Sequence, residues 1–254
     1  MKNNNSISKK TFGLIGKKLS HSFSKGYFAN KFKKSKMKGF DYVNFELNNI
    51  NEFPELLKKD ESIAGFNVTI PYKEVIIPYL DSVSKKAREI GAVNTIAVRN
   101  DKLFGFNTDV YGFENSLAKT MSWKSLDHAL ILGTGGASKA IQYVLEDLGI
   151  SYNLISRTES NETLLYNDLD KRMMKKVQLI VNATPLGMHP NIDDAPNIPY
   201  QFLGPQHLLY DLIYNPEKSL FLKMGEEKGA MIKNGYEMLV LQADRSWQIW
   251  NEDK

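Results

Sequence analysis

Short runs of apolar residues alternate along the chain with longer amphipathic stretches. The apolar runs predict strands at Thr11–Ile15, Tyr42–Leu47, Ile63–Val68, Thr95–Arg99, Ala129–Leu132, Tyr152–Ser156, Leu179–Ala183 and Leu208–Leu212. The amphipathic stretches predict helices around Ser24–Phe32, Asn51–Lys58, Ser84–Ile90, Tyr111–Lys119, Ser138–Leu148, Asn161–Met173, Ser219–Lys228 and Glu237–Asn251. Because the strand candidates are nearly all apolar, we expect helices on both faces of the sheets. The pattern predicts an α/β fold with largely parallel sheets.

The polar segment Ala118–Asp127 marks the best candidate for an internal boundary. A new apolar strand, a glycine-rich turn and a helix follow it directly, which is how a nucleotide-binding unit begins. The final helix comes after the turn Lys233–Gly235, so it can belong to either unit. The pattern therefore predicts two units and leaves open whether the first is discontinuous.

Composition excludes several classes of protein. With 254 residues, 42% hydrophobic and 24% charged, the chain is globular, with one large domain or two small ones. The absence of cysteine excludes disulfides, thiolate zinc sites, iron–sulfur clusters and cysteine nucleophiles. A net charge of +4 is too small to indicate nucleic-acid or membrane partners, and no apolar run approaches the roughly 20 residues of a membrane helix. We expect a cytoplasmic protein.

Residues 130–140 read LILGTGGASKA, a glycine-rich turn between an apolar strand and an amphipathic helix. Gly133, Gly135 and Ser138 occupy the three small positions of the G-x-G-x-x-G/A pattern. That pattern allows a tight turn and a close approach to a pyrophosphate, which then faces the helix N-terminus. In this context the turn predicts a dinucleotide site rather than a purely structural connection.

The end of the next strand indicates which dinucleotide binds. NAD sites place an acidic residue about 20 residues after the glycines, on the ribose hydroxyls. Here Arg157 lies 22 residues after Gly135, and no acid follows until Glu159. A guanidinium can form a forked pair with a 2′-phosphate and stack on adenine. We therefore expect NADP, the alternative being a solvated loop arginine.

The segment GFNVTIPYK, residues 65–73, is a candidate for the reaction chemistry. Asn67 and Thr69 are two residues apart and share one face of a strand. Pro71 ends the strand ladder. Lys73 then follows the carboxyl end of the strand, where open α/β sheets bind ligands, and a lysine there can serve as a general acid or base. On its own, the motif equally fits a solvated surface lysine.

Polar residues also stand at the ends of elements in GAVNT, residues 91–95, and GFNTD, residues 105–109. Asp109 precedes a helix, so it is either a helix cap or a carboxylate partner for Lys73, and spacing leaves both open. In Ser20–Ser24 three serines can cap a helix or bind ligand hydroxyls. His21 among them is expected to be structural.

Together these motifs resemble the shikimate dehydrogenase family. The resemblance runs from Gly13 to Trp250 in the order of the family. No single motif is specific, but the ordered set is. Its members are GLIGKKLSHSFS, GFNVTIPYK, GAVNT, GFNTDVYG, GTGGASKA, SRT, NATPLGM, DLIYNPEKSLFL and NGYEMLVLQADRSWQIW.

The resemblance implies the reversible, NADPH-dependent reduction of 3-dehydroshikimate to shikimate, a step of chorismate and aromatic amino acid biosynthesis. It implies a mixed, mostly parallel α/β substrate-binding domain, residues 1–111 together with 236–254. It implies a Rossmann-type NADP-binding domain at residues 112–235, with the active site in the cleft between the two. The expected partner is a small-molecule substrate, in a monomer or a homodimer without a metal.

The resemblance also implies roles for individual residues. Lys73 and Asp109 are the expected catalytic pair, because a ketone that gains a hydride on carbon needs a proton on oxygen. The expected substrate-binding residues are Ser22, Ser24, Asn67, Thr69, Asn94, Tyr214 and Gln242. The expected cofactor-binding residues are Gly133, Thr134, Gly135, Gly136, Ala137, Ser156, Arg157, Thr158, Leu212 and Gly235.

Four positions depart from the family pattern. Lys25 stands where proline is usual and Phe28 where histidine is usual. Ser156 replaces an asparagine beside the cofactor ribose, and Pro185 replaces a frequent serine. None of these positions is Lys73 or Asp109, so the departures bear on helix packing and cofactor affinity rather than on the catalytic pair.

Three alternatives stay open at this stage. A quinate dehydrogenase, or an enzyme that accepts both substrates and NAD, shares the fold, but the serine pair Ser22 and Ser24 favours shikimate. A non-catalytic NADP-binding regulator would be expected to lack Lys73 or Asp109. A generic binding module explains the glycine turn but none of the other motifs.

Overall fold

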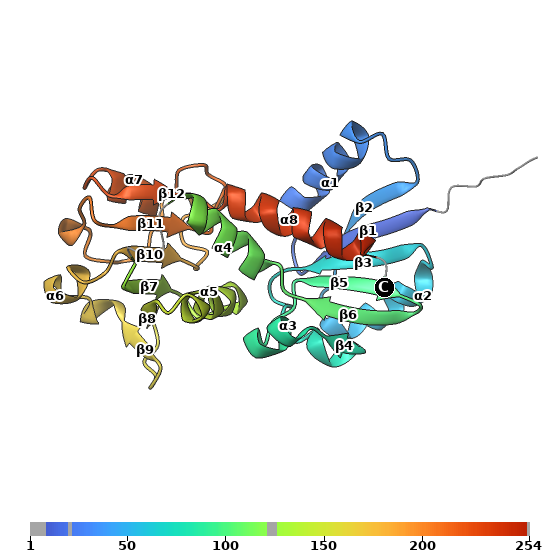
Figure 1. Ribbon diagram of the computed structural model, residues 1–254, viewed down its shortest axis with the longest axis horizontal. Helices are drawn as coiled ribbons and strands as arrows, with labels where there is room; N and C mark the ends of the chain where they lie inside the picture. Colours follow the sequence, from blue (N-terminus) through green and yellow to red (C-terminus); the bar gives the residue numbers. More distant parts are fainter. Residues whose placement is uncertain (1–8, 20–21, 121–125, 253–254) are drawn as a thin grey trace, which may run out of the picture. The chain divides into compact units, whose positions relative to one another are not determined.

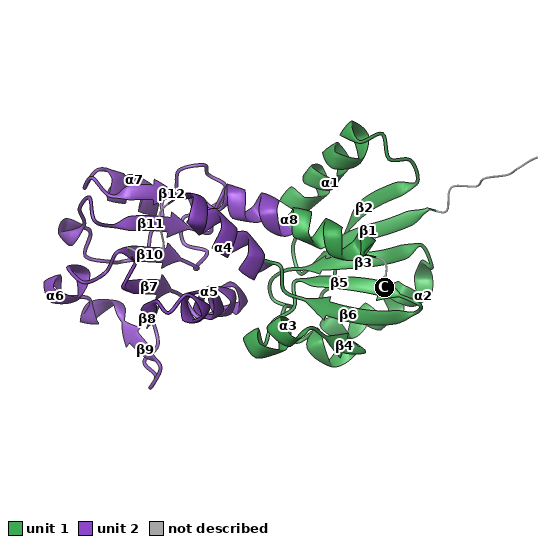
Figure 2. Cartoon of the chain, viewed as in Figure 1, with its two compact units in different colours: residues 1–108, 243–254 green, residues 109–242 purple. Residues whose placement is uncertain are grey.

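The computed structural model describes residues 9–19, 22–120 and 126–252. The chain forms two compact units, shown in Figure 2. Unit 1 consists of residues 1–108 and 243–254, and unit 2 of residues 109–242. The chain therefore passes from one unit to the other twice. Part of the boundary segment Ala118–Asp127 expected from the sequence, residues 121–125, lies outside the described residues.

Unit 1 is built on a mixed sheet, which has six strands among the described residues. Its order is β2-β1-β3-β5-β6-β4 (Figure 1). Strands β2, β1 and β3 are parallel, whereas β5 is antiparallel to both β3 and β6. Asn100 and Asp101, with φ of 49° and 59°, form the tight turn between β5 and β6. The bounds are β1 (Lys10–Gly16), β2 (Phe40–Glu46), β3 (Ile63–Val68), β4 (Ser82–Val83), β5 (Thr95–Arg99) and β6 (Lys102–Phe106).

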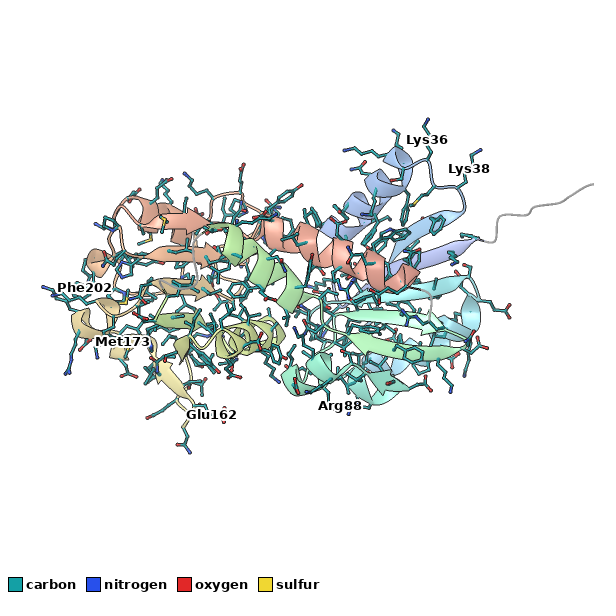
Figure 3. The ribbon with its side chains drawn as sticks, in the orientation of Figure 1. Lys36, Lys38, Arg88, Glu162, Met173 and Phe202 are labelled. Atoms are coloured by element: carbon teal, nitrogen blue, oxygen red, sulfur yellow. The ribbon has the colours of Figure 1, made fainter. Side chains whose placement is uncertain are left out.

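Helices cover both faces of this sheet, as the apolar strands predict. The helices are α1 (Phe23–Lys34), α2 (Phe53–Lys59), α3 (Lys85–Ile90) and the second half of α8 (Tyr236–Asn251). On one face Phe12 packs with Phe28 from α1 and Trp250 from α8. On the other face Ile15 packs with residues from α2 and α3. Lys36 and Lys38, just beyond α1, extend away from the ribbon in Figure 3.

Unit 2 is built on a parallel sheet, again with six strands among the described residues. Its order, β12-β11-β10-β7-β8-β9, is that of a Rossmann fold when counted from β7. The order reverses between β7 and β10, and ligands bind at the carboxyl ends of such a pair. The bounds are β7 (His128–Leu132), β8 (Ser151–Ser156), β9 (Thr163–Leu165), β10 (Leu179–Asn182), β11 (Leu208–Asp211) and β12 (Met231–Lys233).

The helices of unit 2 include α4 (Asp109–Thr120), α5 (Gly136–Asp147), α6 (Lys171–Met174), α7 (Leu220–Glu226) and the first half of α8. α4 and α8 approach closely at Gly112, where a Cβ would lie 2.6 Å from the carbonyl oxygen of Met238. Only glycine leaves room for that crossing. The two sheets confirm the expected α/β fold.

The helix expected over Asn161–Met173 was wrong. This stretch contains β9, a 3₁₀ turn at Tyr166–Asp168 and the short helix α6. Two aspartates explain the interruption: Asp168 accepts a hydrogen bond from the backbone of Leu165, and Asp170 caps α6. The apolar pattern also missed β4, β6, β9 and β12, which are short or carry lysine and glycine.

Candidate active site

The glycine turn lies at the carboxyl end of β7, next to the end of β10. Gly133 has φ of 101°, and its added Cβ would lie 3.0 Å from Thr184 Cγ2. Gly135 is the N-cap of α5, and no side chain caps the helix there. The first backbone N–H groups of α5 therefore lack a side-chain acceptor at their cap, and no atom lies within 4 Å of a Cβ built on Gly135. This geometry fits a pyrophosphate.

The segment Ser156–Thr158 follows β8, the strand next to β7. The Ser156 hydroxyl accepts a hydrogen bond from the backbone N–H of Thr158 at 3.1 Å, which fixes the turn. Arg157 between them is exposed. Its positive charge acts on Tyr166, where it opposes the rise in pKa that burial causes. A guanidinium at this strand end is suited to the 2′-phosphate of NADP.

Leu212 and Gly235, expected near the nicotinamide, are direct neighbours. A Cβ on Gly235 would overlap the carbonyl oxygen of Leu212. The backbone N–H of Gly235 also donates to the carbonyl of Ile213 at 3.0 Å. The loop after β11 therefore packs backbone to backbone against the turn before α8. Tyr214 belongs to the same loop.

The lysine motif leaves β3 through a turn that is held on both sides. The backbone N–H of Thr69 donates to Ile15, and that of Tyr72 donates to Thr69, each at 2.9 Å. The peptide bond between Ile70 and Pro71 is cis. The backbone carbonyl of Lys73 accepts from Val93 at 2.7 Å. These backbone hydrogen bonds fix the position from which the Lys73 side chain extends. Lys73 belongs to unit 1 and is half-buried.

The serine pair begins α1. Ser22 is the N-cap and accepts a hydrogen bond from the backbone of Lys25 at 3.4 Å. Ser24 is buried and hydrogen-bonds Tyr42, whose pKa is raised by burial. Ser20 and His21 lie outside the described residues.

The structure accounts for one of the departures from the family pattern. Phe28 is fully buried and stacks on Tyr42, with ring centroids 4.6 Å apart. The side chain at this position therefore contributes to the aromatic core. Lys25 is exposed on the first turn of α1.

Asp109 and Gln242 stand at the two places where the chain passes between units. Asp109 is the first residue of α4 and is buried. Gln242 is buried on α8, and its side-chain amide donates to the carbonyl of Leu239 at 3.1 Å. Because α4 and α8 cross at Gly112, whose Cβ would lie 3.1 Å from Gln242 Cβ, the two helices are held closely together within unit 2.

Asn67 and Asn94 lie together in unit 1, Asn67 near the carboxyl end of β3 and Asn94 directly before β5, the strand antiparallel to it. The Asn67 amide donates to the backbone carbonyl of Asn94 at 3.3 Å, and both side chains are buried. Thr95, Thr108 and Ser246 complete this cluster. The motifs contain these three residues without indicating a role for them. A usable signal was that Thr95 follows Asn94 and Thr108 precedes Asp109.

Asp211 of unit 2 is a further residue to which no sequence motif assigns a role. It ends β11, is fully buried, and accepts hydrogen bonds from Asn182, Ile213 and Ser219. Burial raises its pKa from 3.8 to about 6, against the opposing effect of these hydrogen bonds. The carboxylate joins the loops that follow β10 and β11. An acid inside the otherwise apolar strand predicted at Leu208–Leu212 was the available signal.

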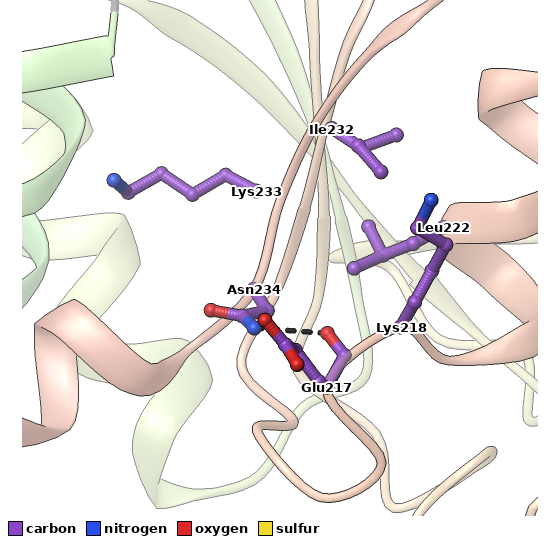
Figure 4. A pocket seen from close by; sticks show the side chains of 6 residues that line it. All are labelled: Glu217, Lys218, Leu222, Ile232, Lys233 and Asn234. Carbon is purple, nitrogen blue, oxygen red and sulfur yellow. Dashed lines mark hydrogen bonds between the residues drawn. The ribbon is translucent and has the colours of Figure 1, made fainter.

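A cavity of about 560 Å³ also opens in unit 2, beside β12 (Figure 4). Its lining consists of Glu217, Lys218, Leu222, Ile232, Lys233 and Asn234. Both lysines are paired with glutamates at 2.7 Å. None of the lining residues is an expected site residue, and the paired lysines do not indicate an anion site.

Within the described ranges, no three His, Cys, Asp or Glu side chains are arranged to hold a metal ion. The described helices also include none with the length and apolar character of a membrane span.

Comparison with known proteins identifies the family. Residues 14–96 match the model of the shikimate dehydrogenase substrate binding domain. A shikimate dehydrogenase (NADP⁺) of Clostridium beijerinckii is 39% identical over 249 residues, which cover 95% of this chain and 92% of the relative. The chain belongs to the shikimate dehydrogenase family.

Solved structures of shikimate dehydrogenases share the fold over nearly the whole chain. Shikimate dehydrogenase 1 of Peptoclostridium difficile matches with a TM-score of 0.85 and 38% identity, covering 96% of this chain and 93% of that one. The shikimate 5-dehydrogenase of Thermus thermophilus, in complex with NADP(H) and shikimate, matches with a TM-score of 0.83 and 27% identity. That match covers 95% of this chain and 93% of the other. Shikimate dehydrogenases of this fold thus include one seen with both ligands.

Proposed function

We propose that this chain is an NADP-dependent oxidoreductase that reversibly reduces 3-dehydroshikimate to shikimate. The observation that carries the proposal is the match over 95% of the chain to a relative named shikimate dehydrogenase (NADP⁺), with both expected catalytic residues, Lys73 and Asp109, present. The Thermus thermophilus structure in complex with NADP(H) and shikimate supports this choice of ligands.

The NADP-binding domain is proposed to comprise residues 112–235, which lie within unit 2, and the substrate-binding domain residues 1–111 and 236–254, which include all of unit 1. The uncapped N-terminus of α5, the open space over Gly135 and the exposed Arg157 support this assignment of the cofactor. The remaining members of the proposed cofactor set are Gly133, Thr134, Gly136, Ala137, Ser156, Thr158, Leu212 and Gly235.

Lys73 is proposed to donate the proton in the reduction. When bound, NADPH supplies a hydride to the carbonyl carbon. The carbonyl oxygen then needs a proton, and the Lys73 ammonium is of the type to donate it and to stabilise the developing negative charge. Asp109 supplies the carboxylate of the acid–base pair. The fixed backbone of Lys73 supports this role, since a general acid must be held in position.

Substrate binding is proposed to rest on Ser22 and Ser24 for the carboxylate, and on amide and hydroxyl side chains for the hydroxyls and the carboxylate region. The latter are Asn67, Thr69, Asn94, Tyr214 and Gln242. Action in the cytoplasm, the absence of nucleic-acid partners and a monomeric or homodimeric state stay predictions from the sequence.

The absorbance of NADPH at 340 nm, followed with 3-dehydroshikimate, tests the proposed function. Parallel reactions with NADH and with 3-dehydroquinate test the cofactor and the substrate. Turnover only with NADPH and 3-dehydroshikimate is the expected result. Comparable rates with 3-dehydroquinate would instead indicate a dual-substrate dehydrogenase. No turnover by folded protein that still binds NADPH would overturn the proposal and favour a non-catalytic NADP-binding regulator.

A further inference from the structure

The side-chain oxygen of Asn94 is fixed by three donors, all within unit 1. It accepts hydrogen bonds from the backbone N–H of Thr108 at 2.7 Å, from the Thr108 hydroxyl at 3.2 Å and from the Thr95 hydroxyl at 3.2 Å. All three residues are at most 2% exposed. The backbone of Asn94 is fixed too, because its N–H donates to Phe106 and its carbonyl accepts from Val68.

Three donors on one oxygen settle which way the amide group faces. A side-chain amide has an acceptor at one end and two N–H donors at the other. With the oxygen turned toward Thr95 and Thr108, the N–H donors of Asn94 lie on the opposite side of the planar group. A flipped amide would instead bring its N–H groups against the backbone N–H of Thr108, which can only donate.

A chain of hydrogen bonds lies behind the Thr95 hydroxyl. The Asn67 amide donates to the Ser246 hydroxyl at 2.9 Å and to the Thr95 hydroxyl at 3.2 Å. The two hydroxyls lie 2.8 Å apart. Because Tyr42 donates to the oxygen of Asn67 at 2.9 Å, the Asn67 amide is itself held in this orientation. The Thr95 hydroxyl accepts from Asn67 and so keeps its own proton for another acceptor, and the Asn94 oxygen lies within hydrogen-bond distance of it at 3.2 Å.

We propose that Thr95 and Thr108, with Ser246 behind them, are positioning residues that orient Asn94 so that it meets the substrate as a hydrogen-bond donor. This inference rests on the proposed function, in which Asn94 binds the substrate. The matching group on the substrate is an oxygen that accepts, such as a ring hydroxyl. Thr95, Thr108 and Ser246 act through Asn94 and do not touch the substrate themselves.

Thr95→Val and Thr95→Ser form the test pair. Valine has the shape of threonine without the hydroxyl, whereas serine keeps the hydroxyl. Loss of one buried hydrogen bond of about 1 kcal/mol predicts that Thr95→Val raises the KM for 3-dehydroshikimate about fivefold. The KM for NADPH stays unchanged and kcat changes less than KM. Thr95→Ser stays within about twofold of the wild type.

Thr11→Val is the matched control. Thr11 is also a buried threonine of unit 1, and its hydroxyl lies 2.7 Å from that of Ser62. It stands at the start of β1, at the opposite end of the sheet from the expected site. Thr11→Val is therefore expected to lower the melting temperature without changing the KM for 3-dehydroshikimate. Ser246→Ala, a second variant of the cluster, is expected to raise that KM by a smaller factor than Thr95→Val.

A double-mutant cycle separates an action through Asn94 from a general structural effect. In an Asn94→Ala background, Thr95→Val is expected to cause no further loss in kcat/KM. Shikimate affinity, measured by titration calorimetry without NADPH, is expected to fall in the same order as kcat/KM. If the wild type is active but Thr95→Val and Thr11→Val have equal KM values for 3-dehydroshikimate, this inference alone is overturned. It is also overturned if Thr95→Val lowers kcat/KM as much in the Asn94→Ala background as in the wild type. Wild type without turnover would overturn the proposed function and this inference with it.

Discussion

Gly235 packs against the carbonyl oxygen of Leu212 with no room for a side chain between them. Both residues belong to the proposed nicotinamide-binding set. A side chain at position 235 would therefore change the shape of the proposed cofactor site. Gly235→Ala is expected to displace the loop after β11. We expect a loss of about 1–3 kcal/mol in the free energy of unfolding and a higher KM for NADPH.

Urea unfolding and steady-state kinetics check this prediction. Gly26→Ala is the control for unfolding, because Gly26 lies within α1 and no atom lies within 4 Å of its added Cβ. That change is expected to be neutral or stabilising by about 0.5–1 kcal/mol. Equal stabilities and equal NADPH KM values in both variants would contradict the close packing of Gly235.

Lys73→Ala tests the proposed general acid. General acid–base catalysis contributes about 10²–10⁴-fold, so kcat is expected to fall by about that factor with little change in substrate KM. Lys58→Ala, at a surface lysine of α2 whose side chain is 71% exposed, is the matched control and is expected to keep full activity. A Lys73→Ala enzyme with unchanged kcat would contradict the role.

Arg157→Ala tests the cofactor preference. A charge-assisted contact with the 2′-phosphate contributes about 1.5–3 kcal/mol, so the KM for NADPH is expected to rise about 10–100-fold. NADH lacks that phosphate, and its KM should not change. Arg172→Ala removes another exposed arginine of unit 2 and should affect neither cofactor. An equal rise in KM for NADPH and for NADH would show that Arg157 does not recognise the 2′-phosphate.

Asp211 makes the stability of the protein depend on pH. Its pKa is raised to about 6 by burial, whereas in the unfolded chain it stays near 3.8. Between about pH 4 and pH 6 the folded protein therefore holds a proton that the unfolded chain has released. Raising the pH through this window is expected to lower the free energy of unfolding by up to about 3 kcal/mol.

Asp211→Asn removes this titration and keeps an acceptor for Asn182 and Ile213. Urea unfolding of both proteins at several pH values between about 4 and 7.5 isolates the contribution, since all other groups are shared. The wild type is expected to lose more stability across the window than the variant. Parallel curves would mean that the carboxyl group titrates alike in the folded and unfolded chain.

Local sequence patterns predicted the bounds of an element correctly where that element is apolar and turn residues stand at both of its ends. β3 and β5 have the predicted bounds, and the glycine turn lies between β7 and α5 as expected. The pattern failed at 161–173, because the carboxylates of Asp168 and Asp170 accept backbone hydrogen bonds that interrupt a helix there. It also failed at β12, which has only three residues. A strand this short forms because it pairs with a neighbouring strand, and a local sequence pattern carries no information about that neighbour.

The expected site residues were available from motifs, but the interactions that orient them were not. Thr95, Thr108 and Ser246 are separated by up to 151 residues in sequence and meet only in the folded unit. Likewise, the donors to Asp211 come from the end of β10, the loop after β11 and the N-cap of α7. A single sequence shows which residues carry chemistry, whereas the network behind them depends on tertiary packing.

The split of unit 1 determines the order in which the two units are completed during synthesis. Unit 2 is continuous from residue 109 to 242, so all of it exists before the segment that completes unit 1 has been translated. Trp250 stacks on Phe12 at 4.6 Å and donates from its indole nitrogen to the carbonyl of Ile96 at 2.9 Å. Until that tryptophan leaves the ribosome, Phe12 of β1 and Phe28 of α1 lack the aromatic ring that packs against both of them. In this protein the domain begun first is the one finished last.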